Sequence, residues 1–314
     1  SALLKSRAYH QSLLEEREDG CEFQVPNKSK ATLPLVELPR TKYNKPYIWR
    51  RYSYLNSQQG GTNDHGEEAE QPADVHHTIS ISHQYPYVGI ARLVKDQQQS
   101  SHSHNRPLHV GFDIAMYEKP NQKLHTTTSE FLEVFKDSFT PSEWGCIVDS
   151  SAAWFGRRRK SDENSRREFY LRWAVKEAYT KALGLGLGHE FGKFEVVFDC
   201  CEDEEGFGGL AEAIGTFGFN TEGSDARADE MIGKRLATFG RIKYTGRDTN
   251  FGESGTWHFT FLELQDKPTD GGAIGCACVC LGPLEEDSIK ICSNIVQEDI
   301  LTLEDAIQWH QRYQ

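Results

Sequence analysis

The chain has 314 residues, of which 37% are hydrophobic and 26% are charged, so it can bury a substantial core. Its formal net charge is −12 at pH 7, which argues against general nucleic-acid binding, because neutralising phosphates needs an excess of Lys and Arg. This charge does not exclude one local site for an anion.

Hydropathy and cysteine usage indicate the compartment. The sequence has no apolar run of the roughly 18 residues that a membrane span needs, and no visible secretory leader. Its eight cysteines include no CxxC pair, and we expect a soluble protein in a reducing compartment, the cytoplasm. Cys276, Cys278 and Cys280 alternate in an apolar segment, which favours one buried face of a strand over a metal site.

The first part of the chain alternates predicted elements with polar segments. The chain begins without Met, and we expect some upstream sequence to be missing. The patterns predict a helix at 1–17, a strand and a basic turn within 32–48, two strands about the turn at Gln84–Pro86 within 77–94, and a strand at 108–115. Two polar segments, 56–74 and 95–107, have the composition of disordered insertions.

The second part is richer in predicted helices. We expect a helix at 128–139, a helix at 140–155, a densely charged loop at 156–168, a helix at 166–183, strands to about 282, and a last helix at 302–314. Thr140 is the predicted N-cap of the second helix, with Glu143 closing a capping box. This order predicts an α+β protein, with room for two similar halves that meet near 108–115.

The predicted helix at 166–183 carries charge on one side. At about 100° per residue, one arc of about 140° holds Trp173, Lys176, Glu177 and Lys181. The opposite arc is apolar and suited to packing: Leu171, Val175, Ala178 and Ala182. Gly184 stands where a C-terminal glycine ends a helix. Taken alone, this pattern is typical of a solvated face with an i,i+4 Glu–Lys pair.

Asp113 changes that interpretation. It lies in the apolar strand segment "VGFDIA", where an ionised carboxylate is costly unless it is paired or binds a metal. Strand alternation places it on the same face as Gly111 and Ala115. Two carboxylates on separate elements, Asp113 and Glu177, suit a hard cation such as Mg²⁺, which commonly combines one or two carboxylates with phosphate oxygens. Flanking lysines would then hold a diphosphate.

These segments resemble a known family. "VGFDIA", preceded by "ISISHQ" and followed by "WAVKEAYTKALGLGLG", is similar to the three signatures of the Sfp-type 4'-phosphopantetheinyl transferases. "LPRTKYNKPYI", "FTPSEW" and the tail "IVQEDILTLEDAIQW" resemble the eukaryotic, fungal-like cytosolic branch that acts on aminoadipate reductase in lysine metabolism. The resemblance covers roughly residues 30–282.

The resemblance implies a fold and a division of the chain. The family fold is a pseudo-twofold pair of α+β halves with coenzyme A bound between them. On this basis we expect an N-terminal half at 1–107, a C-terminal half with the metal site at 108–282, and a C-terminal extension with a helix at 283–314. Two halves in one chain make a monomer sufficient.

The resemblance also implies roles at the reacting end of coenzyme A. Asp113 and Glu177 would hold Mg²⁺ on the diphosphate, and Lys176 and Lys181 would contact it. Lys181 would donate a proton to departing 3',5'-ADP, and Glu177 would be the general base. Many bacterial members have a third carboxylate at the position where this chain has Ala115. Eukaryotic members also lack that carboxylate, so we expect water to take its place on the metal.

Other residues are implied to bind the rest of coenzyme A. Ser82 and His83 would meet its 3'-phosphate, and Gln84 would border the metal shell. The turn that cradles the adenine and phosphate end would comprise Arg40, Thr41, Lys45 and Pro46. A further phosphate-contacting arginine of relatives has no match in this sequence.

The expected reaction transfers 4'-phosphopantetheine from coenzyme A to a serine of an acyl or peptidyl carrier protein. Aminoadipate reductase, fatty-acid synthase and polyketide or other secondary-metabolite synthases all remain open as carriers. A different class, a coenzyme A-binding scaffold or sensor without catalysis, is the alternative. The basic run at 157–160 is compatible with a solvated loop, a dock for an acidic carrier or a nuclear-localisation-like patch.

Overall fold

The computed structural model describes residues 79–93, 108–118, 127–148, 161–185, 189–201, 209–220, 232–245, 255–265, 273–284 and 296–302. Several predicted features lie outside these residues: the helices at 1–17 and 302–314, the strand at 32–48, the polar segments at 56–74 and 95–107, and the basic run at 157–160. No helix in the described part of the chain is long and apolar enough to cross a membrane.

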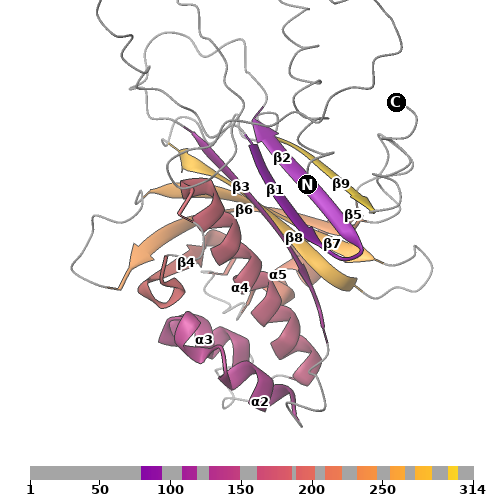
Figure 1. The fold of residues 1–314 in the computed structure, drawn as a ribbon. Coiled ribbons are helices and arrows are strands. Elements are labelled where there is room, and N and C mark those ends of the chain that lie inside the picture. The colour runs from indigo at the N-terminus through magenta and orange to yellow at the C-terminus, as the bar shows by residue number, and fades with distance from the viewer. Residues whose placement is uncertain are drawn as a thin grey trace, which may run out of the picture.

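The strands of the described residues form two sheets, and the fold is α+β as predicted (Figure 1). The smaller sheet has the order β1-β2-β9 and is antiparallel throughout: β1 (Ile79–Gln84), β2 (Tyr87–Leu93) and β9 (Val296–Thr302). The two strands predicted within 77–94 are therefore confirmed. Strand β9 was not predicted, and it joins the last part of the chain to β2.

The larger sheet contains the predicted metal strand. It has the order β3-β8-β7-β6-β4, with β5 paired to β6. Its strands are β3 (His109–Met116), β4 (Phe194–Phe198), β5 (Phe219–Asn220), β6 (Ile232–Tyr244), β7 (Thr256–Gln265) and β8 (Ala273–Leu284). Their pairings are antiparallel. The strand expected at 108–115 is β3, and it lies at the edge of this sheet.

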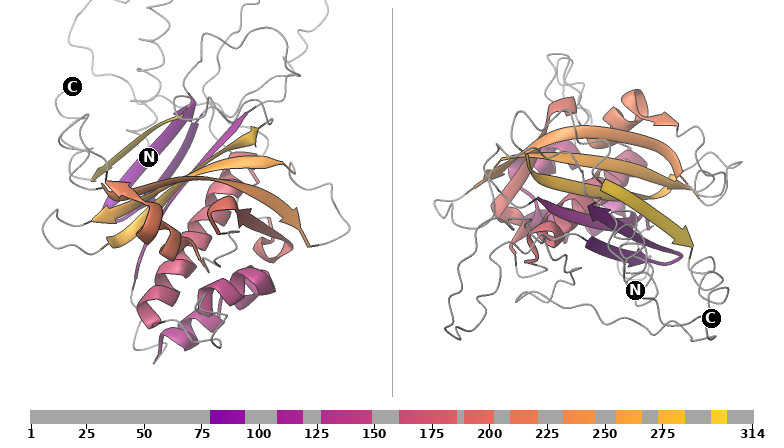
Figure 2. Two further views of the ribbon diagram at one scale, coloured as in Figure 1. Left: turned by 180° about the vertical axis from the view of Figure 1, so that it is seen from behind. Right: turned by 90° about the horizontal axis from the view of Figure 1, so that it is seen from above.

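The helices gather on one face of the larger sheet (Figure 2). They are α2 (Thr128–Glu133), α3 (Pro141–Val148), α4 (Asp162–Leu183) and α5 (Leu210–Phe217), with short 3₁₀ turns η1 (Lys136–Ser138), η4 (Phe191–Lys193) and η5 (Asp199–Cys201). Helix α4 runs along β3 and β8, and α3 packs against α4. Gly184 ends α4 in the left-handed conformation at φ 73°, as predicted.

Two predicted helix boundaries were wrong, and one helix was not predicted. The helix expected at 128–139 ends at Glu133 and is followed by η1. Helix α4 begins inside the expected loop at 156–168, because the Ser161 hydroxyl accepts from the amide of Asn164 at 3.3 Å and acidic residues follow in the first turn. Helix α5 was not predicted and lies in the region expected to be rich in strands.

Strand β3 separates two cores. Toward α4, the apolar arc of that helix is fully buried as predicted, together with Cys276, Cys278 and Cys280 of β8. On the other face, Val110, Phe112 and Ile114 pack in a core that includes residues of the smaller sheet. The alternation inferred from "VGFDIA" is therefore confirmed, and it places Asp113 on the face toward α4.

Side chains, rather than a backbone ladder, join β1 to β3. Three alternate residues of β1 accept amide protons from β3: Ser80 from Phe112 at 2.9 Å, Ser82 from Ile114 at 3.2 Å, and Gln84 from Met116 at 3.0 Å. Each bond satisfies an amide of an edge strand. This seam fixes the smaller sheet beside Asp113.

Candidate functional site

The candidate site lies where β1, β3 and α4 meet. The ammonium of Lys181 is 2.6 Å from Oδ1 of Asp113 and donates to the Ser82 hydroxyl at 3.0 Å. The Ser82 hydroxyl in turn donates to the same Asp113 oxygen at 2.9 Å. Asp113 and Ser82 are 6% and 7% exposed, whereas the Lys181 side chain is 29% exposed. A buried carboxylate, a hydroxyl and a solvent-reaching cation thus form one cluster.

Glu177 belongs to the same electrostatic cluster. Burial raises the pKa of its carboxyl, and the negative charge of Asp113 raises this pKa further, against the opposing effect of Lys181. Burial also raises the pKa of Asp113, although Lys181 and Ser82 oppose that shift. A carboxylate whose ionisation is disfavoured by burial and by a second carboxylate provides a setting in which a cation is stabilised.

Helix α4 comes this close to β3 because residue 111 is glycine. A Cβ atom there would lie well inside contact distance of the Ala178 carbonyl oxygen, and 2.8 Å from the Ala182 backbone nitrogen. The helix backbone therefore rests directly on the strand, at the residues that follow Glu177 and Lys181 in the sequence. The small residue two positions before Asp113 brings the carboxylates of the two elements together.

The donor set fits a hard divalent cation. Carboxylate oxygens are its preferred protein ligands, and Mg²⁺ typically takes one or two of them plus phosphate oxygens and water. Asp113 and Glu177 supply two such groups from different elements. No group of three or more His, Cys, Asp or Glu residues within the described residues is arranged for a metal ion.

The predicted residues of β1 divide between its two faces. Ser82 and Gln84 turn toward β3, and Gln84 also donates to Glu118 at 3.2 Å. His83 is exposed on the other face of the strand. Ser82 donates its one hydroxyl proton to Asp113, so donating to a phosphate would require breaking that bond. The 3'-phosphate contacts of Ser82 and His83 and the metal-shell position of Gln84 stay predictions.

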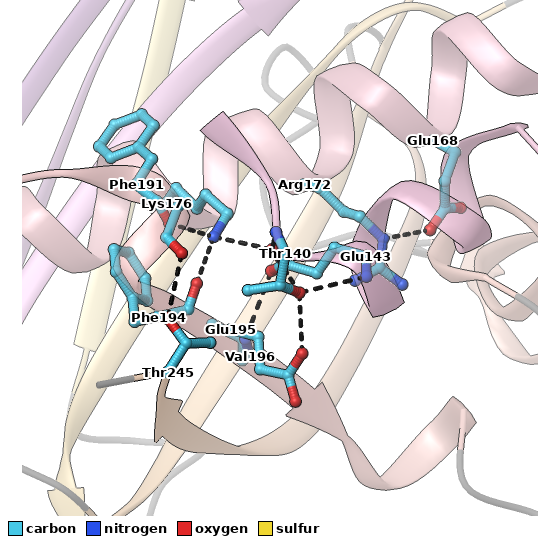
Figure 3. Close-up of polar contacts among 11 residues, drawn as sticks. Thr140, Glu143, Glu168, Arg172, Lys176, Phe191, Phe194, Glu195, Val196 and Thr245 are labelled. Carbon is cyan, nitrogen blue, oxygen red and sulfur yellow. Dashed lines mark hydrogen bonds and ion pairs between the residues drawn. The ribbon is translucent and has the colours of Figure 1, made fainter. Parts of the chain in front are cut away.

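The side chain of Lys176, expected to contact the diphosphate beside Lys181, turns inward to Glu143 instead (Figure 3). Its side chain is fully buried, and its ammonium lies 2.8 Å from Glu143 Oε2. It also donates to the carbonyl oxygens of Phe191 and Phe194, at 2.8 and 2.6 Å. These three acceptors match the three protons of an ammonium group, so none is directed at a diphosphate. Burial lowers the Lys176 pKa, and Glu143 opposes this shift.

Sequence reasoning missed the partner of Lys176. Glu143 closes the predicted capping box with Thr140, accepting its amide at 3.1 Å and donating its own amide to the Thr140 hydroxyl at 3.3 Å. Capping alone explained Glu143 in the sequence, so nothing there indicated a second role. The structure shows that Glu143 is buried, and a buried carboxylate needs a cationic partner, which Lys176 provides.

Comparisons with known proteins agree with this geometry. Residues 109–222, which include Asp113, Glu177 and Lys181, match the family model of the 4'-phosphopantetheinyl transferase superfamily. This part of the chain is thus similar to that superfamily. Ser82 precedes the matched segment, and the structure connects it to Asp113 and Lys181.

Curated phosphopantetheinyl transferases are similar to part of the chain. One from Thraustochytrium sp. is 40% identical over 80 residues, which are 25% of this chain and 25% of that protein. The L-aminoadipate-semialdehyde dehydrogenase-phosphopantetheinyl transferase of Rattus norvegicus is 32% identical over 118 residues, 37% of this chain and 30% of that protein. The protein of that name from Schizosaccharomyces pombe is 34% identical over 109 residues, 35% of this chain and 34% of that protein. The matches span about a third or less of the relatives' own lengths.

Two further sets of predicted residues have different outcomes. The predicted adenine and phosphate turn of the transferase lies outside the described residues: Arg40, Thr41, Lys45 and Pro46. Trp173 of the charged arc packs against aromatic residues, with its ring centroid 5.5 Å from that of Phe135 and 5.3 Å from that of Phe191.

Proposed function

We propose that this protein transfers 4'-phosphopantetheine from coenzyme A to a serine of a carrier-protein domain and releases 3',5'-ADP. The observation that carries the proposal is the cluster of Asp113, Ser82 and Lys181 beside Glu177, within a chain segment of the transferase superfamily. The cluster combines carboxylates that can bind a metal ion with the Lys181 ammonium, which reaches solvent and is available to a phosphate.

In the proposed reaction, the carrier serine oxygen attacks the β-phosphorus of coenzyme A. A new P–O bond forms to the serine, and the bond between that phosphorus and the bridging oxygen breaks. Glu177 accepts the serine proton, a role that its raised pKa favours because a general base works best when its pKa is closer to the operating pH. Lys181 neutralises and protonates the departing 3',5'-ADP oxygen.

Asp113 and Glu177 would hold the Mg²⁺ that this chemistry uses. When bound, the ion supplies charge stabilisation to the phosphate oxygens. Ser82 orients the Asp113 carboxylate and supports the Lys181 ammonium through its hydroxyl. The rest of coenzyme A would lie between two α+β halves, at 1–107 and 108–282, with the segment 283–314 as an extension.

The proposed carriers are apo acyl or peptidyl carrier domains, and aminoadipate reductase is the first to test. Relatives that are 31–34% identical over 35–37% of this chain carry L-aminoadipate-semialdehyde dehydrogenase in their names. Carrier domains of fatty-acid and polyketide synthases are the other candidates. We place the activity in the cytoplasm and in a monomer.

The test is intact-mass measurement of an apo carrier domain after incubation with the full chain, coenzyme A and Mg²⁺. A mass gain of one phosphopantetheine is expected, and a carrier with alanine in place of the accepting serine should gain none. Asp113→Asn should lower the rate by about 100-fold or more, the scale of losing a transition-state charge partner. The control Asp137→Asn changes an exposed carboxylate on η1 and should keep the rate.

Failure of every carrier to gain mass would refute the transferase. Coenzyme A binding measured by calorimetry without transfer would instead identify a scaffold or sensor.

A further inference from the structure

Helix α4 carries a line of buried charged residues (Figure 3). Glu168, Arg172 and Lys176 are four residues apart and so follow one face of the helix. They are 0%, 5% and 0% exposed. Arg172 pairs with Glu168 at 2.8 Å, and Lys176 pairs with Glu143 of α3 at 2.8 Å.

The two carboxylates in these ion pairs, Glu168 and Glu143, also accept backbone amides of neighbouring elements. Glu168 accepts the amides of Leu210 and Ala211, at 3.0 and 2.8 Å, where α5 begins. Glu143 closes the N-terminus of α3 and accepts the amide of Val196 on β4 at 3.4 Å. The charges of α4 are thus connected to α3, α5 and β4 by directional bonds.

At Gly111 the contact of α4 with β3 fixes the distance between the two backbones but does not interlock them, and the directional contact on this side is the Lys181–Asp113 ion pair. At Gly111 the helix backbone meets a strand position without a side chain, so no knob enters a groove of the helix there. The directional contacts of Lys176 also resist rotation, since its ammonium is held by Glu143, Phe191 and Phe194 together. Glu177, the next residue, points about 100° away from Lys176 around the helix.

We propose that the Lys176–Glu143 ion pair is a positioning element that fixes the rotation of α4 and thereby directs Glu177 toward Asp113. The proposal rests on the proposed function for its catalytic consequence. Lys176 thus acts through Glu177 and touches neither coenzyme A nor the carrier. A buried ion pair is a weak source of stability compared with apolar packing, so orientation is its distinctive contribution.

The experiment compares Lys176→Met, Glu143→Gln and the double variant in the full chain. Lys176→Met leaves a buried carboxylate without its cation, and we expect a loss of folding stability. The double variant has neither charge, and Gln still fits a capping box, so it should recover most of that stability. Lys136→Met, which removes an exposed lysine paired with Glu133, is the matched control.

The decisive measurements are the transfer rate per folded molecule at saturating coenzyme A and Mg²⁺, and the Kd for coenzyme A in the presence of EDTA, where Glu177 holds no metal ion. We expect the double variant to regain stability but to stay about 100-fold slower, because small misplacements of a catalytic group cost rates of that order. Its Kd for coenzyme A should equal that of the wild type, and the control should match the wild type throughout. A rate that recovers together with stability would show a merely structural role and overturn the proposal. A Kd raised tenfold or more, about 1.4 kcal/mol, would show a diphosphate contact instead and also overturn it.

A crystal structure of the double variant separates this proposal from the proposed function. If wild-type protein modifies no carrier, the transferase assignment fails, and the direction of Glu177 alone decides the positioning role. A rotated α4 with Glu177 turned from Asp113 supports the proposal. An unchanged Glu177 overturns it.

Discussion

Gly111 of β3 lies directly beneath the carbonyl oxygen of Ala178 on α4, with no space for even one methyl group between strand and helix. This contact lies between Asp113 on the strand and Glu177 and Lys181 on the helix. The separation of strand and helix backbones therefore sets the separation of the charged groups.

Gly111→Ala should destabilise the protein and lower the transfer rate. The added Cβ atom meets backbone atoms that have no rotamer to change, so α4 must move away from β3. Overpacking of this kind typically costs about 1–3 kcal/mol. Chemical denaturation gives the free energy of unfolding, and carrier modification at saturating coenzyme A gives the rate.

The matched control is Gly145→Ala within helix α3. A Cβ atom there meets nothing within 4 Å, and replacing a helical glycine by alanine should stabilise by about 0.5–1 kcal/mol. Equal effects of the two substitutions on stability would contradict the close contact at Gly111.

Ser80 and Ser82 provide a second matched pair on β1. Each accepts an amide proton of β3. In the described contacts, Ser82 also bonds Asp113 and Lys181, whereas Ser80 does not. Ser80→Ala and Ser82→Ala each leave a buried amide without its acceptor, which costs about 1–3 kcal/mol. Unfolding measurements should show similar losses of stability.

The transfer rates of these two variants should differ. Ser82→Ala frees the Asp113 carboxylate and the Lys181 ammonium to take other positions, so its rate per folded molecule should fall. Ser80→Ala should keep the wild-type rate once corrected for the folded fraction. Equal rates for both variants would show that Ser82 serves the seam between the sheets and nothing more.

The protonation of Glu177 provides the pH-dependent prediction. Burial and Asp113 raise its pKa above 4.5, so the folded state holds this proton more tightly than the unfolded chain does. Protonated Glu177 therefore stabilises the folded state at pH values below the ordinary carboxyl pKa. This stabilisation is lost as pH rises through the raised pKa of the folded state. The transfer rate should rise over that same interval, because a general base must be deprotonated.

Carbon-13 NMR of the Glu177 carboxyl measures this pKa directly. Asp113→Asn should lower it by removing the second cause of the shift, yet leave it above the ordinary value because burial remains. Glu177→Gln should abolish both the stability trend and the acid limb of the rate profile. An unchanged Glu177 pKa in Asp113→Asn would contradict the coupling of the two carboxylates.

Elements with a strong local pattern were predictable from the sequence. The alternation in "VGFDIA" identified the faces of β3, and the spacing of Leu171, Val175, Ala178 and Ala182 identified the packing arc of α4. Elements whose existence depends on distant partners were missed. Strand β9 exists through pairing with β2, and Glu168 on a different helix accepts the first amides of α5.

The sequence by itself determined that Asp113 shares a strand face with Gly111 and Ala115 and that Glu177 and Lys181 lie on one side of their helix, because strand and helix periods are local backbone properties. It could not determine the direction of Lys176, which the same helical arc contains. Only the tertiary structure decided that Lys181 reaches Asp113 while Lys176 turns inward to Glu143. A flexible lysine side chain adopts the direction in which folded neighbours offer acceptors, and those acceptors come from elements far away in the chain.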